Sequence, residues 1–176
     1  MVGIVDNQIP RLYACYLDFD GVLHDEDVRL DAGRRIILAT PGRRLFEWQE
    51  ILVDLLACHP HVKIVLSTSW VRARSFSYAK RQLDPRLQGR VIGATFHRRF
   101  MDLRDFVALP RGMQIWGDVL RRNPWDWFGV DDDGFGWPAW CRDKLVLTDE
   151  KLGLSDPAVQ GDIRRRLQMW SGMPTS

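Results

Sequence analysis

The stretch that decides the fold is Leu17-Asp18-Phe19-Asp20-Gly21-Val22-Leu23-His24. It continues the apolar run Leu12–Phe19, which is short and rich in aliphatic and aromatic residues and therefore predicts a buried strand. Asp18 and Asp20 stand two positions apart, so a strand would point both carboxylates to one face, where they repel each other. A cation between them removes the repulsion. Mg²⁺ suits carboxylate oxygens because it keeps water and substrate phosphate in its coordination shell. Gly21 lets the backbone turn away without a side chain in the way.

Further short apolar runs alternate with helical patterns along the chain. Strands are predicted at Val62–Leu66, Trp127–Val130 and Lys144–Leu147, with a weaker one at Val91–Ala94. Apolar stripes of helical period predict helices over 42–58, after Pro110 and over 156–170. This alternation predicts an α/β fold, a three-layer α/β/α sandwich around a mostly parallel, Rossmann-like sheet. The segments Gly21–Thr40 and Gly134–Asp143 are expected to be long loops.

Composition favours one folded domain spanning residues 1–176. Of the 176 residues, 45% are hydrophobic, and eight Trp and eight Phe provide enough burial to exclude a disordered chain. The net charge of +2 selects no class of partner, and no apolar stretch reaches the roughly 18 to 20 residues of a membrane helix. Residues 1–10 contain Asp6 and are not expected to be a secretory signal. Three cysteines (Cys15, Cys58 and Cys141) lack metal-type spacing and fit the reducing cytoplasm.

Polar residues follow the predicted strands. In parallel sheets, ligands bind outside the carboxyl ends of the strands. Ser67-Thr68-Ser69-Trp70 follows the second strand, where hydroxyls and free backbone N–H groups can hold phosphate oxygens or cap a helix. Asp131-Asp132-Asp133 follows the strand at Trp127–Val130 and, beside Gly134, also fits an acidic turn. Pro110-Arg111-Gly112 places a positive charge just before a helix.

These residues, taken in order, resemble the haloacid dehalogenase-like (HAD) superfamily of phosphohydrolases. Its signatures are an Asp-x-Asp-Gly block, a Ser or Thr after the second strand, a Lys or Arg before a helix and a late acidic pair. The matching residues here are Asp18/Asp20/Gly21, Ser67, Arg111 and Asp131/Asp132. More narrowly, four phrases look like the HAD domain of Swiss Army Knife RNA repair proteins: 17–24, 64–70, 91–95 and 145–149. The resemblance runs over about residues 12–150, the motif-bearing core, and implies a HAD-like fold with no or minimal cap.

The resemblance implies a covalent mechanism of phosphate transfer. Asp18 would attack phosphorus and form an aspartyl-phosphate. Asp20 would protonate the leaving alkoxide and then activate the hydrolytic water. A halide leaves without a proton, so the presence of Asp20 favours phosphoester cleavage over carbon–halogen cleavage. Mg²⁺ would be held by Asp18, the main-chain carbonyl of Asp20 and the late pair, with Asp132 in direct contact and Asp131 beside it.

Several roles stay open at this point. Ser67 or Thr68 would bind the phosphate oxygens, Ser67 lying nearer the end of the apolar run. Arg111, a purely electrostatic group, would bind them too, although Arg98 or Arg99 could replace it. His24 either touches the substrate or is satisfied locally, and Trp70 either stacks on a base or packs under its own loop. The remaining histidines (His59, His61 and His97) are interpreted as structural. The tryptophans around the acidic triplet (Trp125, Trp127, Trp137 and Trp140) are expected mainly in core and loop packing.

The substrate is inferred from coverage and charge. The segments on either side of Ser67 are too short for a full cap domain, which predicts an open site suited to bulky substrates. The segment 71–100 contains eight basic residues and only one acidic residue, Asp84. It is interpreted either as a substrate-binding surface or as a solvated helix face. With the RNA-repair resemblance, a phosphorylated RNA or DNA end becomes the leading substrate. The alternatives are a nucleotide or sugar phosphate, phosphotransfer to another acceptor, and a non-catalytic nucleic-acid-binding module.

Overall fold

A five-stranded parallel sheet forms the centre of the fold in a computed structural model, which describes residues 11–33 and 35–171. Its strands are β1 (Tyr13–Leu17), β4 (Val62–Leu66), β5 (Val91–Ala94), β6 (Asp126–Asp131) and β7 (Leu145–Leu147). They lie in the order β5-β4-β1-β6-β7, and each neighbouring pair is parallel. The predicted α/β fold is confirmed. The prediction that residues 1–10 are not a secretory signal concerns a stretch outside the described residues.

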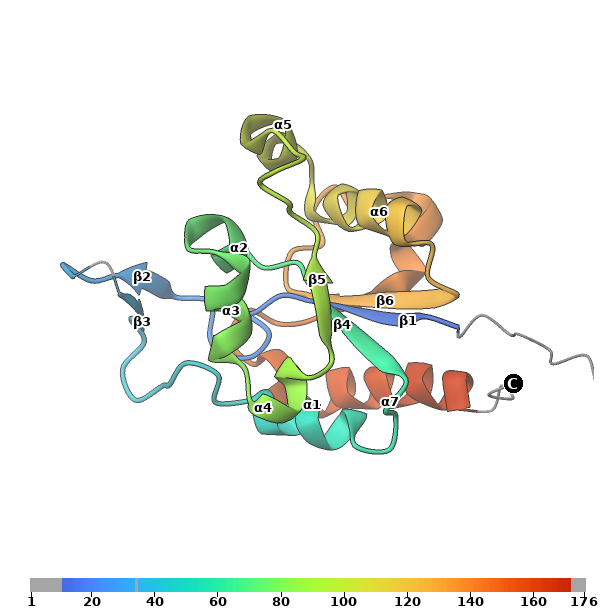
Figure 1. Ribbon diagram of the computed structural model, residues 1–176. Coiled ribbons are helices and arrows are strands. Elements are labelled where there is room, and N and C mark those ends of the chain that lie inside the picture. The colour runs from blue at the N-terminus through green and yellow to red at the C-terminus, as the bar shows by residue number, and fades with distance from the viewer. Residues whose placement is uncertain (1–10, 34, 172–176) are drawn as a thin grey trace, which may run out of the picture.

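Helices cover both faces of the sheet, as Figure 1 shows. On one face lie α1 (Gln49–Leu56) and α7 (Pro157–Ser171), and on the other lie α6 (Arg111–Arg122) and the 3₁₀ helix η1 (Ala139–Lys144). The cause is the two-residue period of the central strand β1. Its residues Tyr13, Cys15 and Leu17 pack into the apolar cluster that contains α1 and α7. Its residues Ala14 and Tyr16 pack into the cluster that contains α6 and η1. The predicted three layers therefore follow from β1 being buried on both sides.

Short helices connect the sheet on its β5 side. Between β4 and β5 the chain forms α2 (Trp70–Ala73), α3 (Phe76–Gln82) and α4 (Pro85–Gln88), and α5 (Leu103–Ala108) follows β5. The Ser75 hydroxyl accepts the Tyr78 N–H at 3.0 Å and so caps α3. A one-turn 3₁₀ helix, η2 (Gly153–Ser155), leads into α7. These connections carry most of the basic residues of the segment 71–100.

The expected loop Gly21–Thr40 contains a hairpin instead. Strands β2 (Val28–Leu30) and β3 (Ile36–Leu38) pair in antiparallel fashion, and the hairpin projects from the sheet in Figure 1. Its turn is closed by Asp31, whose carboxylate accepts the Arg35 backbone N–H at 2.7 Å. Within the described residues, the segment between β1 and α1 holds this hairpin and no helix, which agrees with a minimal cap. The other expected loop, Gly134–Asp143, ends in η1.

Helix α1 begins at Gln49, later than the helix predicted over 42–58. The backbone before it is held by the loop after β1, because Trp48 donates its N–H to the Leu23 carbonyl at 3.0 Å. Phe46 has a left-handed φ of 59°, which a helix cannot contain. The apolar residues within 42–48 are therefore spaced for burial against this loop and do not form part of a helix.

Candidate active site

The carboxyl ends of three neighbouring strands bring distant residues together. Leu17, the last residue of β1, pairs with Leu66 of β4 and Val130 of β6. Asp18, Ser67 and Asp131 are the residues that follow these three. Backbone bonds fix their alignment, since Ser67 donates its N–H to the Leu17 carbonyl at 2.9 Å and Asp18 donates to the Val130 carbonyl at 3.1 Å. The parallel register thus creates a site from three separate segments.

Asp18, Asp131 and Asp132 form an acidic cluster at this edge. Carboxylate oxygens of the three residues lie within 4.8 Å of one another, close enough to share one metal ion. Asp131 is fully buried and Asp18 nearly so. Gly21 permits the closeness of Asp132: its φ is 66°, and a Cβ there would overlap the Asp132 carboxylate. The sequence predicted that Gly21 leaves the site free of an obstructing side chain, and the structure shows that the group it leaves room for is the Asp132 carboxylate.

Arg111, the first residue of α6, is the basic residue at this cluster. Its Nη2 lies 2.8 Å from Asp18 Oδ2, its Nε lies 3.1 Å from Asp131 Oδ2, and Nη1 donates to the Ser67 carbonyl. The alternatives to it, Arg98 and Arg99, are exposed in the segment after β5. The guanidinium therefore joins all three strand ends.

The charges of this cluster call for a further cation. Burial first, and then the charge of Asp20, raise the pKa of Asp18 despite the Arg111 charge beside it. Burial and the Asp18 charge raise the pKa of Asp131 well above its ordinary range and that of Asp132 to about 7. When all three carboxylates are ionised, the one guanidinium leaves an excess of negative charge, which a divalent cation would balance. A hard ion with oxygen ligands fits this donor set, and Asp18, Asp131 and Asp132 would hold it.

Ser67 and Thr68 differ in what their hydroxyls already bind. Thr68 Oγ1 accepts the backbone N–H of Trp70 at 3.3 Å and so braces the start of α2. Ser67 Oγ is buried and has no hydrogen-bond partner within the part of the chain that the structure describes. A buried hydroxyl without a partner is costly unless a ligand satisfies it. This contrast favours Ser67 as the phosphate-binding residue.

Asp20 lies outside the acidic cluster and is held by neutral donors, two of them on Oδ1. Its Oδ1 is 2.8 Å from the Trp70 indole Nε1 and 3.1 Å from His24 Nε2. His24 is fully buried, and its Nδ1 accepts the Phe46 backbone N–H at 3.3 Å. Because Nδ1 is the acceptor, Nε2 carries the ring proton and donates it to Asp20. The other oxygen, Oδ2, accepts a long hydrogen bond of 3.5 Å from the Ser69 hydroxyl, and the side chain of Asp20 is partly exposed. The Asp20 carboxylate is not one of the three clustered candidate metal ligands. From the sequence, only the main-chain carbonyl of Asp20 was assigned to the metal, and that role stays a prediction.

The structure resolves other open roles. Trp70 is 2% exposed, so the base-stacking alternative is wrong and the packing alternative holds. Asp133 is not part of the acidic cluster. The histidines interpreted as structural do not belong to it either: His59 and His61 lie before β4, and His97 follows β5. Trp127 and Trp137 are buried as expected. Trp125 and Trp140 are mostly exposed, which the sequence did not predict.

Sequence reasoning missed a brace under the site. After β7, the Thr148 hydroxyl donates to the Gly21 carbonyl at 2.8 Å, and Leu154 donates its N–H to the Val22 carbonyl at 3.0 Å. These bonds fix the loop that carries Asp20. The signal was present in the strand-end rule, since Thr148 directly follows the last strand.

Comparison with known families agrees with this geometry. The protein-family model described as the HAD domain in Swiss Army Knife RNA repair proteins matches residues 14–159. The chain belongs to this family. The match spans β1 through the start of α7 and includes every site residue named above. Membership of the HAD superfamily indicates a hydrolase of the phosphatase type. No curated protein and no solved structure matches the chain. Among the described residues of this HAD domain, no helix is both long and apolar enough to span a bilayer.

Proposed function

We propose that the protein is a Mg²⁺-dependent phosphohydrolase that acts through an aspartyl-phosphate on the phosphorylated end of a polynucleotide. The observation that carries this proposal is the meeting of Asp18, Asp131 and Asp132 with Arg111, while Asp20 is held separately beside them. A nucleophile and a proton carrier need these different environments. Asp18 is kept among charged groups, and Asp20 is bound by neutral donors.

The first step forms the covalent bond. A carboxylate oxygen of Asp18 attacks phosphorus, and the bond between phosphorus and the ester oxygen breaks. The leaving alkoxide takes a proton from Asp20, and Arg111 and Ser67 bind the non-bridging oxygens of the phosphoryl group as it is transferred. Asp20 Oδ1 already accepts two short hydrogen bonds, whereas Oδ2 has one long contact of 3.5 Å with the Ser69 hydroxyl, so the proton of Asp20 is carried on Oδ2.

The second step releases phosphate. Asp20, now a carboxylate, takes a proton from water as that water attacks phosphorus, and the bond from phosphorus to Asp18 breaks. Asp18, Asp131 and Asp132 would hold Mg²⁺, which would offset the repulsion between carboxylate and phosphate oxygens. Inorganic phosphate leaves, and Asp18 and Asp20 return to their starting states.

The test is phosphate release from 3′- and 5′-phosphorylated RNA and DNA oligonucleotides, compared with mononucleotides. Asp18→Asn should abolish release, whereas the matched variant Asp133→Asn should retain it, because Asp133 lies outside the acidic cluster. Equal turnover by the Asp18 variant would remove the nucleophile role. Faster turnover of mononucleotides would instead indicate a small-molecule phosphatase. Transfer of a radiolabelled phosphate to another acceptor, without release of free phosphate, would indicate phosphotransfer.

Unpaired thiols support the proposed location. Cys15, Cys58 and Cys141 are all free, and two of the three are buried. Proteins of oxidising compartments use cysteine mainly in disulfides, so we propose that the chain acts in the reducing cytoplasm.

A further inference from the structure

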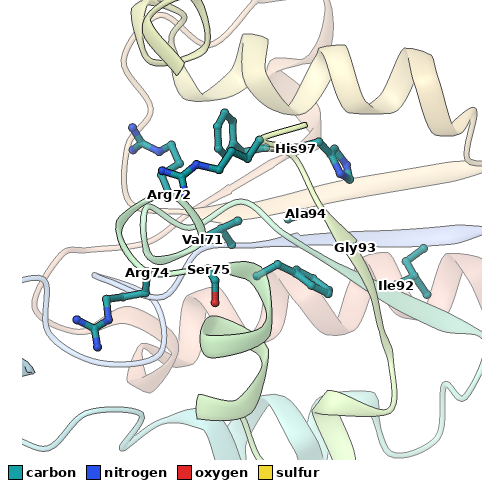
Figure 2. Close-up of a pocket in the computed structure, with 11 residues that line it drawn as sticks. Val71, Arg72, Arg74, Ser75, Ile92, Gly93, Ala94 and His97 are labelled. Atoms are coloured by element: carbon teal, nitrogen blue, oxygen red, sulfur yellow. The ribbon is translucent and has the colours of Figure 1, made fainter. Parts of the chain in front are cut away.

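A cavity of about 420 Å³ opens beside the site, between the α2–α3 turn and β5. Figure 2 shows Val71, Arg72, Arg74 and Ser75 on one side of it and β5, with Ile92 and Gly93, on the other. Its volume lies within the range of small-ligand pockets, roughly 300 to 1,000 Å³. It therefore has the size of a single nucleotide unit and not of an extended groove.

The cavity lies at the carboxyl edge of the sheet, as the acidic cluster does. Ala94, which lines it, pairs with Leu66, the residue directly before Ser67. Arg72 lines it as well and lies close enough to Asp18 and Arg111 for their charges to act on it. If the terminal phosphate of a polynucleotide reached Asp18, the nucleotide that carries this phosphate would lie at the cavity.

The chemistry of the lining is apolar with a basic margin. Phe96 and Val71 are buried and Phe76 is 36% exposed, while the charged lining residues are Arg72, Arg74 and Arg98. No acidic residue lines the cavity in the described part of the chain. Aromatic surface with arginines is the combination that holds a stacked base and its phosphates.

Arg72 distinguishes this surface from an ordinary basic face. It is half-buried, and its guanidinium forms no hydrogen bond or ion pair with any described residue. Other basic residues of 71–100 are used within the fold: Arg86 pairs with Asp84 and Glu50, and Arg90 donates to main-chain carbonyls. Arg86 and Arg90 are thus structural, whereas Arg72, Arg74 and Arg98 line the cavity.

We propose that this cavity binds the nucleobase next to the scissile phosphate of a polynucleotide end, with Arg72 and Arg98 on the adjoining phosphodiesters. The proposal rests on the proposed function and adds to it the position of the terminal nucleotide. Phe76 provides the stacking surface, and the arginines neutralise the backbone.

The test measures binding without turnover, in the Asp18→Asn variant. A phosphorylated oligonucleotide with 2-aminopurine as its terminal base is compared with one that has an abasic site there. Phe76→Ala should weaken binding of the first about tenfold, because one stacked base is lost, and leave the abasic one little changed. Phe100→Ala, the same change at a 79% exposed residue outside the cavity, should affect neither. Arg72→Gln should weaken both and lower the slope of log affinity against log salt by about one.

The outcomes separate this proposal from the proposed function. Equal effects of Phe76→Ala on the two oligonucleotides, or no effect on either, would overturn the cavity assignment even where the wild type releases phosphate from both. A base-dependent effect with no phosphate release by the wild type would support the cavity and refute the phosphatase.

Discussion

Replacing Trp70 by Phe should slow phosphate transfer only where the leaving group needs a proton. The indole is buried and its Nε1 donates to Asp20 Oδ1 at 2.8 Å. Phe preserves an aromatic ring against Phe19 and Phe46 but removes that donor. The substitution therefore acts on the orientation of Asp20 more than on the packing around it.

The size of the effect follows from the two donors on Oδ1. A hydrogen bond to a charged group contributes about 1.5 to 3 kcal/mol. His24 still donates to the same oxygen from 3.1 Å, so the loss should lie at the lower end of that range. This corresponds to about a tenfold fall in kcat/KM for an alkyl phosphate. With p-nitrophenyl phosphate, whose leaving group departs as a stable anion, kcat/KM should change little.

The assay compares the two substrates in Trp70→Phe, Asp20→Asn and the double variant. Because Trp70 acts through Asp20, the double variant should be no slower than Asp20→Asn alone. The matched control is Trp170→Phe: that indole is also 2% exposed and also donates to a carboxylate, Asp126, at 2.8 Å. The control should lose stability without any dependence on the leaving group. Equal losses on both substrates, or additive losses in the double variant, would refute the reasoning.

Three further predictions concern the metal site and the fold. Gly21→Ala should abolish Mg²⁺ binding in calorimetry by displacing the Asp132 carboxylate, while Gly42→Ala, with a φ of 78° and open space around its Cβ, should bind normally. Mg²⁺ should raise the unfolding temperature of the wild type, and Asp132→Asn should lose that rise; a rise that persists would contradict metal binding there. Asp126→Ala should destabilise the fold by about 2 kcal/mol in urea unfolding near neutral pH. Burial raises the pKa of Asp126, but hydrogen bonds, first that from Lys144, outweigh it and leave the pKa below its ordinary value. That stabilisation is present above the unfolded-state pKa and is lost as pH falls through the folded one, so the difference between variant and wild type should shrink in acid.

The sheet and the meeting of its strand ends were predictable because both depend on patterns carried by neighbouring residues. Apolar runs fixed β1, β4 and β6, and parallel strands necessarily end at one edge. Asp18, Ser67 and Asp131 therefore had to lie close together. The hairpin β2–β3 was not predictable in this way, since its three-residue strands are shorter than the runs that give a strand signal, and Leu30 and Ile37 are largely exposed.

The surroundings of Asp20 could not be predicted because they depend on contacts between distant segments. Trp70 lies 50 residues further along the chain, and the Phe46 N–H reaches His24 only through a left-handed backbone. A single sequence offers a packing role and a substrate role for each aromatic residue. The choice between them is made by the assembled core.

That choice has a consequence for how this site can vary. Phe19, Phe46, Trp70 and His24 form one cluster of edge-to-face rings, with centroids 4.9 to 5.8 Å apart. Two members of this cluster also hold Asp20, so the same packing that stabilises the loop after β1 orients the proton carrier. A substitution at Phe46 would move the amide that fixes the His24 tautomer although it touches no substrate. Loss of turnover and loss of stability should therefore rise together for this cluster, whereas at Asp18 turnover should fall without a loss of stability, because the pKa of that carboxyl is already raised by burial.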